Sequence, residues 1–410
     1  MEAELRQPEI NIGVVGHVDH GKTTLVQAIT GIWTSKHSEE LLRSMTIKLG
    51  YADTDVYECP DRSVYERYVT DPLECPNAVY RRSISFVDSP GHEVLMANML
   101  SGAAIMDSAL LVIAANEPCP QPQTREHFMA LEVIGVKNVI VVQNKVDVVS
   151  KEQARKNYEE IKAFLSGTFA EKAPIIPVSA LHGANIDVLL SAVEHFFKTP
   201  ERDVTAKPLM FVARSFDVNR PGTPPEKLVG GVIGGSVVKG VFRVGDEIEI
   251  SPGVKVVEGG KTVYKKLYTK IESIRFGERF YEKAGPGGLV AMGTALDPSL
   301  TKADKLVGSV VGLADQLPQP RTHFSADYSL FERVVGTKEL QKVPPLRTGE
   351  RIIVTAGTAI AMAVIKRLSS DWFEVELVDK PVIVWKGMKI AISRNVMNRW
   401  RLVGWGIVRD

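Results

Sequence analysis

Short apolar runs alternate with longer segments of helical periodicity along the first half of the chain. Strands that are buried on both faces read as continuous apolar runs, so this alternation predicts a mostly parallel sheet with helices on both faces. The predicted strands cover residues 10–15, 83–87, 109–113, 139–142 and 175–178. The predicted helices cover residues 23–30, 125–134, 151–165 and 186–197. We therefore expect one α/β domain over residues 1–200.

The pattern changes at the polar segment 201–206, which predicts a linker. Beyond it, short alternating stretches are separated by turn signals and carry little helical periodicity, as is typical of a β-barrel or a β-sandwich. Pro318 and Pro320 interrupt this pattern, which divides the second half into β domains over 207–320 and 321–410. The predicted strands are 230–238, 242–250, 268–276, 289–294, 351–357, 361–368, 372–378 and 382–385.

The composition is that of an ordinary globular protein, with 44% apolar and 24% charged residues among 410. The net charge of +1 indicates no overall attraction to nucleic acid or to an anionic membrane, although a local basic surface is compatible with it. Three cysteines are too few for a disulfide framework. The apolar runs fall far short of the ~18 residues that cross a bilayer. We expect a cytoplasmic protein without membrane or DNA partners.

Residues 16–23 read Gly-His-Val-Asp-His-Gly-Lys-Thr and lie between a predicted strand and a predicted helix. In that context the Gly-x4-Gly-Lys-Thr pattern binds nucleotide phosphates, because glycines let backbone N–H groups curl around the oxygens. Lys22 is expected to reach the β- and γ-phosphates, and the Thr23 hydroxyl to bind Mg²⁺. The residues expected to hold nucleotide here are Asp19, His20, Gly21, Lys22, Thr23 and Thr24.

A second segment, residues 88–91, ends the predicted strand 83–87. A carboxylate at the C-terminal end of a parallel strand can hold Mg²⁺ directly or through water, which is the role expected of Asp88. The Gly91 N–H can meet a γ-phosphate oxygen. Alone, Asp-x-x-Gly is usually a turn, so its weight comes from the motifs around it.

Two further segments suit guanine. The Asp147 carboxylate, in Asn144-Lys145-Val146-Asp147, can accept the two N–H groups that guanine has and adenine lacks. Because an unpaired buried carboxylate is costly, such a site discriminates strongly against adenine. Backbone N–H groups after a further strand can bind guanine O6. The residues expected to line the guanine site are Asn144, Lys145, Asp147, Ser179, Ala180 and Leu181.

Together these motifs resemble those of translational GTPases, the class that includes elongation factor Tu. More specific segments resemble the gamma subunit of archaeal and eukaryotic translation initiation factor 2. They are residues 38–41 (SEEL), 46–51 (TIKLGY), 116–118 (NEP), 121–124 (QPQT), 214–219 (RSFDVN), 296–298 (LDP) and 400–406 (WRLVGWG). The resemblance spans nearly the whole chain and favours an archaeal member, since eukaryotic relatives carry longer N-terminal extensions and insertions.

The resemblance implies a P-loop GTPase domain followed by two β-barrels, and the reaction GTP + H₂O to GDP + phosphate. It implies a carrier that binds methionylated initiator tRNA in the GTP state, delivers it to the small ribosomal subunit with its mRNA, and releases it after hydrolysis. The implied protein partners are the alpha and beta subunits of the same factor. Two alternatives stay open: an elongator-type carrier of other aminoacyl-tRNAs, and a nucleotide-gated scaffold without useful hydrolysis.

The resemblance also assigns a set of metal-binding residues. Thr46 corresponds to the switch I threonine that completes Mg²⁺ coordination when GTP is bound. Asp19 corresponds to a position that helps to hold a second Mg²⁺, with a backbone carbonyl from the position that Ser44 occupies here. With the residues named above, the implied metal set is Thr23, Thr46, Asp19, Asp88 and Ser44.

A catalytic set follows from the same resemblance. His92 matches the histidine that orients the attacking water, and positioning that water is a main source of acceleration in phosphoryl transfer. Val18 and Met45 would form an apolar gate around it. Lys22 completes this set through its contact with the phosphates.

The insertion at residues 52–80 departs from the family pattern. Family members often carry two Cys-Pro-x-Cys elements there, and four thiolates would bind a structural zinc ion. Here the elements read Cys59-Pro60-Asp61-Arg62 and Cys75-Pro76-Asn77-Ala78, so each has lost its second cysteine. Two thiolates make a poor closed zinc site, and a disulfide is disfavoured in the cytosol. We expect no zinc in this hairpin.

Basic and aromatic residues alternate near the end of the chain, between residues 386 and 409. These residues could face RNA phosphates and bases, and they are Lys389, Arg394, Arg399 and Arg401 together with Trp400 and Trp405. The same pattern also fits an ordinary barrel strand whose outer face is solvated. The residues alone leave both interpretations open.

Overall fold

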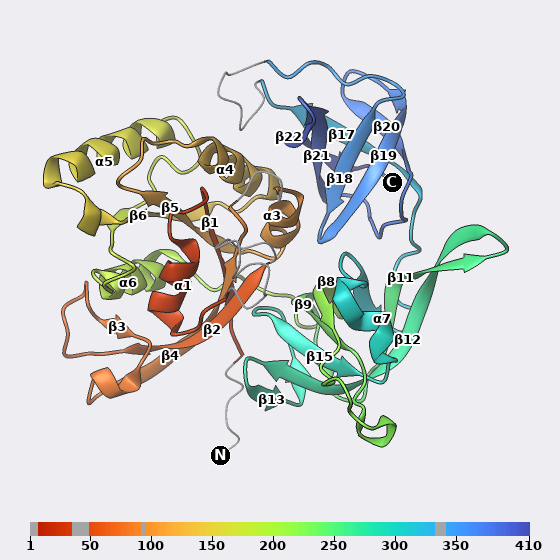
Figure 1. Cartoon of the computed structure of the whole chain (residues 1–410), viewed down its shortest axis with the longest axis horizontal. Coiled ribbons are helices and arrows are strands. Elements are labelled where there is room, and N and C mark those ends of the chain that lie inside the picture. Colours follow the sequence, from red (N-terminus) through yellow and green to blue (C-terminus); the bar gives the residue numbers. More distant parts are fainter. Residues whose placement is uncertain (1–6, 35–48, 92–95, 333–341) are drawn as a thin grey trace. The chain divides into compact units, whose positions relative to one another are not determined.

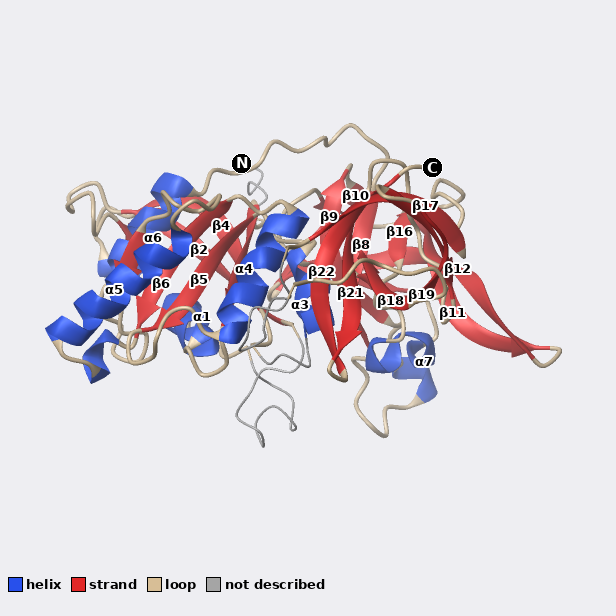
Figure 2. Cartoon of the chain, turned by 90° about the horizontal axis from the view of Figure 1, so that it is seen from above, coloured by secondary structure: helices blue, strands red, loops and turns tan. Residues whose placement is uncertain are grey.

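The computed structural model describes residues 7–34, 49–91, 96–332 and 342–410. The chain forms two compact units, one containing residues 8–200 and the other residues 201–332 and 343–410. Helices lie almost wholly in the first unit, whereas strands dominate the second (Figure 2). Among the helices of these described ranges, none is long and apolar enough to cross a bilayer.

The first unit is built on a seven-stranded sheet in the order β3-β2-β4-β1-β5-β6-β7. Its strands are β1 (Ile10–Gly16), β2 (Gly50–Glu58), β3 (Tyr68–Val69), β4 (Val79–Asp88), β5 (Ser108–Ala114), β6 (Asn138–Asn144) and β7 (Ile175–Pro177). β1 pairs in parallel with β4 and β5, and β6 continues the parallel pairing to β7. The predicted mostly parallel sheet is confirmed. Its antiparallel edge, β2 and β3, was not predicted from the periodicity.

Helices cover both faces of this sheet (Figure 1). They are α1 (Lys22–Thr30), α3 (Met96–Ala103), α4 (Pro122–Ile134), α5 (Lys151–Leu165) and α6 (Ile186–Phe196), with the short 3-10 turns η1 (Pro72–Glu74) and η3 (Val146–Val148). α1 and α6 share one core with alternate residues of the strands, such as Leu25 and Leu189 against Ile12. The four predicted helices are therefore present, and α3 is an additional one.

The first barrel of the second unit closes because β11 pairs with β12 as well as with β16. Its ring is β11 (Glu247–Glu258), β16 (Val310–Leu313), β8 (Leu209–Phe216), β9 (Val232–Lys239), β15 (Val290–Thr294) and β12 (Lys261–Phe276). β13 (Arg279–Tyr281) extends β12, and β10 (Phe242–Arg243) pairs with β14 (Lys283–Ala284). The single strand predicted over 242–250 is wrong. A turn at Gly245, with φ of 94°, separates β10 from β11.

The second barrel is a closed antiparallel ring in the order β17-β20-β19-β18-β21-β22. Its strands are β17 (His323–Leu330), β18 (Arg351–Ala356), β19 (Ala359–Leu368), β20 (Trp372–Leu377), β21 (Lys389–Val396) and β22 (Arg399–Val408). The expected pair of barrels is confirmed. The strand predicted over 382–385 is wrong, because only an isolated bridge joins Val382 to Arg321. Val382, Ile383 and Val384 are nevertheless buried, since an apolar run indicates burial and not a pairing partner.

The basic stretch near the chain end contributes to the interior of the second barrel. Arg394 and Arg401 are only 9% and 5% exposed, which excludes both guanidinium groups from an RNA-facing surface. Arg394 Nε donates to Glu350 Oε1 at 2.5 Å, and its Nη1 donates to Pro344 O at 2.5 Å. For these two arginines the interpretation as a solvated outer face is also wrong, because both side chains are buried.

We expect Arg394→Met to lower the free energy of unfolding of the second barrel by about 3 kcal/mol, because it leaves the Glu350 carboxylate without its partner. Denaturant unfolding followed by tryptophan fluorescence measures this, since four of the five tryptophans lie at residues 372–405. Arg351→Met, on the exposed side of β18, is the matched control and should change stability by less than about 0.5 kcal/mol. Equal effects of the two substitutions would contradict the structural role of Arg394.

Candidate nucleotide site

The loop between β1 and α1 is shaped by backbone positions that only glycine can occupy. Gly16 has φ of 143°, and a Cβ there would lie 2.3 Å from Val112 O. Gly21 has φ of 86°, and a Cβ there would lie 2.4 Å from Asn144 Nδ2. The loop therefore packs directly against β5 on one side and against the end of β6 on the other. This is the close approach that a phosphate-binding loop requires.

Lys22 begins α1 and is only 6% exposed. Its Nζ donates to His17 O at 2.6 Å, which folds the side chain back over the loop. Burial lowers the pKa of this ammonium group to about 8, while Asp88 and Asp19 act in the opposite direction. A Cβ on Gly91 would lie 2.4 Å from Lys22 Nζ and 2.9 Å from Val18 N. The two phosphate motifs expected from the sequence therefore lie together in the fold.

Asp88 lies at the end of β4 and is fully buried. Its Oδ2 accepts hydrogen bonds from the Thr23 hydroxyl at 2.7 Å and from the Thr34 hydroxyl at 2.6 Å. A hydroxyl beside a carboxylate is an oxygen donor set that suits Mg²⁺. The contact of Thr23 with Asp88 agrees with the expected metal set. Thr34 is an addition, because a lone threonine after a helix carries no motif.

The far end of the loop is held by His20. Its Nδ1 lies 3.0 Å from Val112 O, and its Nε2 lies 3.3 Å from Glu117 Oε2. Burial lowers the pKa of His20 to about 4, so the ring is neutral at pH 7 and Nδ1 donates its single proton to Val112 O. Asp19, just before it, adopts a left-handed conformation with φ of 60°. Thr24 follows in the first turn of α1 and is partly buried.

Asn144 connects the loop to the expected guanine segments. Its Nδ2 donates to His20 O at 2.9 Å, and its Oδ1 accepts the Ala180 N–H at 3.0 Å. The amide therefore joins the phosphate loop to the segment after β7. The sequence does not predict that the Ala180 N–H donates to the Asn144 side chain.

Asp147 and Ser179 lie side by side. A hydrogen bond with the Ser179 side chain lowers the pKa of Asp147 below its usual range, and His182, with Nε2 3.7 Å from Asp147 Oδ2, acts in the same direction. Lys145 precedes Asp147 in a left-handed conformation with φ of 63°. Asp147 is thus an ionised acceptor at the end of β6, as the guanine interpretation requires.

Four of the expected residues, Ser44, Met45, Thr46 and His92, lie outside the described residues. In the insertion, Cys59 and Cys75 are buried with Val69 in a small apolar cluster. Burial raises the pKa of the Cys59 thiol to about 11, and its hydrogen bond with Cys75 acts in the same direction. Within the described ranges, His, Cys, Asp and Glu side chains form no group of three or more that could hold a metal ion.

Residues at and beside the positions of the lost cysteines, Arg62 and Ala78, make other contacts. Arg62 donates from Nη2 to Glu74 O at 2.7 Å, and Asn77 donates from Nδ2 to Asp61 Oδ2 at 2.8 Å. Both hydrogen bonds join the loop that starts at Cys59 to the loop around Cys75. The expected hairpin is therefore present, and polar contacts between its two loops tie it together.

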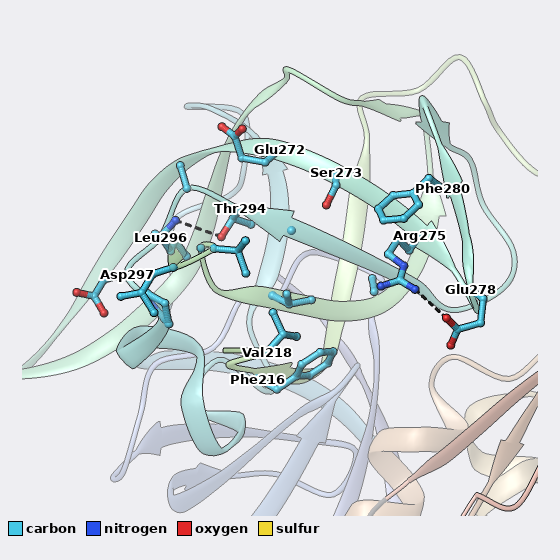
Figure 3. Close-up of a pocket in the computed structure, with 18 of the residues that line it drawn as sticks. Phe216, Val218, Glu272, Ser273, Arg275, Glu278, Phe280, Thr294, Leu296 and Asp297 are labelled. Atoms are coloured by element: carbon cyan, nitrogen blue, oxygen red, sulfur yellow. Dashed lines mark hydrogen bonds and ion pairs between the residues drawn. The ribbon is translucent and has the colours of Figure 1, made fainter. Parts of the chain in front are cut away.

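A second candidate site is a cavity of approximately 940 Å³ in the first barrel. Figure 3 shows Phe216 and Val218 on one side of it and Arg275 and Phe280 on another. The guanidinium carbon of Arg275 lies 4.7 Å from the centre of the Phe280 ring, and Arg275 Nη2 lies 3.1 Å from Glu278 Oε2. Phe280 is 69% exposed, so one face of its ring is accessible to a ligand in the cavity.

This cavity brings together two segments that carry the resemblance, 214–219 and 296–298. Asn219 holds the loop that follows, because its Nδ2 donates to Val229 O at 2.8 Å and its Oδ1 accepts the Val229 N–H at 2.9 Å. No local pattern in the sequence predicts the cavity. Its lining comes from several strands and from the loop 217–230, which are far apart along the chain.

A nucleotide-binding loop at the C-terminal edge of a mostly parallel sheet, followed by two barrels, defines a GTPase of the elongation factor Tu type. The family model described as "Elongation factor Tu GTP binding domain" matches residues 7–199. The crystal structure of the bacterial selenocysteine-specific elongation factor EF-Sec is 25% identical, with a TM-score of 0.72, and covers 97% of this chain and 58% of that one. Elongation factor SelB of Methanococcus maripaludis, solved with GppNHp, is 22% identical, again with a TM-score of 0.72. That match covers 99% of this chain and 80% of that one.

The closer relatives are more specific. The family model "Initiation factor eIF2 gamma, C terminal" matches residues 322–408. The translation initiation factor 2 gamma subunit of Aeropyrum pernix is 60% identical over 98% of this chain and 99% of its own. The gamma subunit of Methanocaldococcus jannaschii is 55% identical over 99% of this chain and 98% of its own. The chain belongs to the family of translation initiation factor 2 gamma subunits and is a translation initiation GTPase. The family assignment decides against the elongator-type alternative.

We expect the free energy of unfolding of the GTPase domain to fall between about pH 7 and pH 5. His20 and His127 are buried and neutral in the fold, but their pKa is 6.5 in an unfolded chain, which therefore binds more protons below that pH. The loss approaches about 1.4 kcal/mol per pH unit for each such histidine. Denaturant unfolding followed by helical circular dichroism measures the slope. His20→Gln should lower the number of protons taken up on unfolding by one, and so make the slope of the unfolding free energy against pH shallower. The exposed His195→Gln should leave the slope unchanged. An unaltered slope in His20→Gln would contradict the neutral state of His20 in the fold.

Proposed function

We propose that this protein binds methionylated initiator tRNA in its GTP state, delivers it to the small ribosomal subunit with its mRNA, and releases it after hydrolysis. The family membership supports this, because its relatives are named as gamma subunits of translation initiation factor 2. In the structure, the observation that supports the GTP-dependent step is that Lys22, Asp88 and Gly91 lie close together. The two phosphate motifs therefore meet at one place in the GTPase domain.

The nucleotide contacts follow from the site geometry. Lys22 and the backbone N–H groups of residues 19–24 hold the phosphates, and Asp147 accepts the N1 and N2 hydrogens of guanine. Asn144 and Lys145 support this arrangement from the end of β6, and Ser179 keeps Asp147 ionised. Backbone N–H groups of the segment 179–181 donate to guanine O6. Gly91 donates its N–H to the γ-phosphate.

Thr23 and Asp88 fit Mg²⁺, because a buried carboxylate and a hydroxyl in contact are ligands that this ion prefers. We place Thr46 as a further ligand in the GTP state, and Asp19 with the Ser44 carbonyl at a second Mg²⁺. When bound, the ion supplies neutralisation of charge on the phosphate oxygens.

For hydrolysis, His92 orients the attacking water and Lys22 stabilises the charge that develops on the transferred phosphoryl group. Val18 and Met45 form the apolar gate beside His92. The position of Val18 next to Gly91 supports this, because it puts the gate residue beside the segment that leads to His92. The products are GDP and phosphate.

We propose that the hairpin at residues 52–80 binds no zinc. Cys59 and Cys75 supply two thiols, and the contacts of Arg62 and Asn77 tie together the loops that four thiolates would otherwise join. A protonated, desolvated Cys59 thiol is a poor metal ligand, since the thiolate is the form that binds.

The cavity of the first barrel is the proposed site for the aminoacylated end of the tRNA. Its exposed apolar residues, such as Val218 and Phe280, suit the flat face of a terminal base and the methionyl side chain. Arg275 adds a cation beside the phosphate that precedes them. The alpha and beta subunits of the same factor are the proposed protein partners.

Asp147→Asn should weaken GDP binding by about a hundredfold or more and restore binding with xanthosine diphosphate, whose 2-carbonyl meets the new amide. Titration calorimetry with both nucleotides measures this. Asp187→Asn, at the start of α6, is a matched carboxylate-to-amide control and should bind GDP as the unaltered chain does. Unchanged GDP affinity in Asp147→Asn would remove this residue from the base site.

Filter binding should show that charged initiator tRNA binds more tightly to the GTP-loaded chain than to the GDP-loaded chain. Phe280→Ala should weaken binding in the GTP state about tenfold, because one stacking partner is lost. Val257→Ala removes an equally exposed apolar residue from the same barrel and should have no effect. If Phe280→Ala also binds normally, the cavity is not the tRNA site; if charged elongator tRNA binds equally well, the proposed cargo is wrong.

A further inference from the structure

A buried histidine outside the nucleotide motifs contacts the first residue of the phosphate loop. The Gly16 N–H donates to His127 Nδ1 at 3.0 Å, although the two residues are 111 positions apart along the chain. His127 is 1% exposed and Gly16 is buried, so water does not compete for this hydrogen bond. The Gly16 N–H is thereby satisfied by the protein and points to α4 instead of to a phosphate.

The element that carries His127 is firmly packed. Phe128, the next residue of α4, stacks on Phe169 with ring centres 4.7 Å apart and meets the edge of Phe164 of α5 at 5.2 Å. Phe128 and its neighbour Leu131 are at most 2% exposed. Because aromatic packing on one side fixes the helix, the imidazole on its other side reaches Gly16 from a defined position.

Both ends of the loop are held at the same register position of β1 and β5. Gly16 is the register partner of Val112 in the pairing of β1 with β5. His127 holds the N–H of Gly16, and His20, at the other end of the loop, holds the carbonyl of Val112 at 3.0 Å. The two imidazoles need opposite tautomers, because Nδ1 accepts in His127 and donates in His20.

We propose that His127 is a positioning residue for the phosphate loop: as the acceptor of the Gly16 N–H, it fixes the starting edge of the loop so that the following N–H groups face the phosphates. His20 fixes the other end, and together the two form a histidine clamp. The inference rests on the proposed nucleotide site. It gives His127 no contact with GTP and no share in bond breaking.

Burial is the main reason that His127 stays an acceptor. The titratable groups that act on it in the same direction are Lys22 of α1, which is cationic, and His17 and His20 of the loop. Burial and these neighbours lower the pKa of His127 well below its ordinary value of 6.5. The ring therefore stays neutral with a bare Nδ1, and binding of the triphosphate beside Lys22 does not depend on titration of this residue at neutral pH.

Two substitutions separate the hydrogen bond from the packing. His127→Leu fills a similar volume but leaves the Gly16 N–H unpaired. His127→Asn keeps an acceptor, because its Oδ1 is the same number of bonds from Cα as His Nδ1. Val133→Ala, buried on the same helix, is the control for lost packing without loss of the hydrogen bond. The probe is N-methylanthraniloyl-GDP, and the readouts are its Kd and dissociation rate on the full chain, beside denaturant stability.

We expect His127→Leu to raise the Kd about tenfold, mainly through faster dissociation, as loss of one buried hydrogen bond partner implies. His127→Asn should recover most of this affinity, and Val133→Ala should lose stability but keep its Kd. An unchanged Kd in His127→Leu, or equal losses in the Leu and Asn variants, would overturn the proposal. If the unaltered chain itself binds no GDP, the proposed nucleotide site fails instead.

Discussion

The GTPase domain is organised around one buried ammonium group. Lys22 is 6% exposed, lies over the loop that it terminates and has a pKa lowered by desolvation to about 8. A charge held in this way is poorly solvated, so a phosphate that enters beside it gains more than it would at the protein surface. A side chain at Gly91 would clash with this ammonium group, whereas side chains at Gly16 and Gly21 would push the loop away from β5 and from the end of β6.

The contacts that hold the loop come from three separate parts of the sheet and its helices. Asn144 joins the loop to the guanine segment, Asp88 joins it through Thr23 to β4, and His127 joins it to α4. Each contact uses a buried polar group, and such a group destabilises the fold when its partner is missing. The contacts are therefore cooperative.

The second unit consists of two closed barrels that act as rigid supports. Closed barrels have no free sheet edge, so they are rigid supports on which loops and exposed side chains can be displayed. In the first barrel this support presents an apolar cavity with charged groups at its rim. In the second barrel, Arg394 bonds to Glu350 and to the carbonyl of Pro344, and so serves the fold instead of a ligand. Arg394 thus has a structural task that its place in a basic stretch does not reveal.

The sequence by itself determined the class of fold, the phosphate loop, Asp88, and the guanine segment with Asp147. These are local patterns: each motif directly follows a buried strand, and parallel strands bring their C-terminal ends to one edge whatever the rest of the chain does. Only the tertiary structure decided that Thr34 shares Asp88 with Thr23, that Ala180 serves Asn144, and that His127 accepts from Gly16. It also decided that residues 382–384 are buried without forming a strand. The reason is that these features depend on contacts between residues distant along the chain, and periodicity reports burial but not the identity of the neighbour.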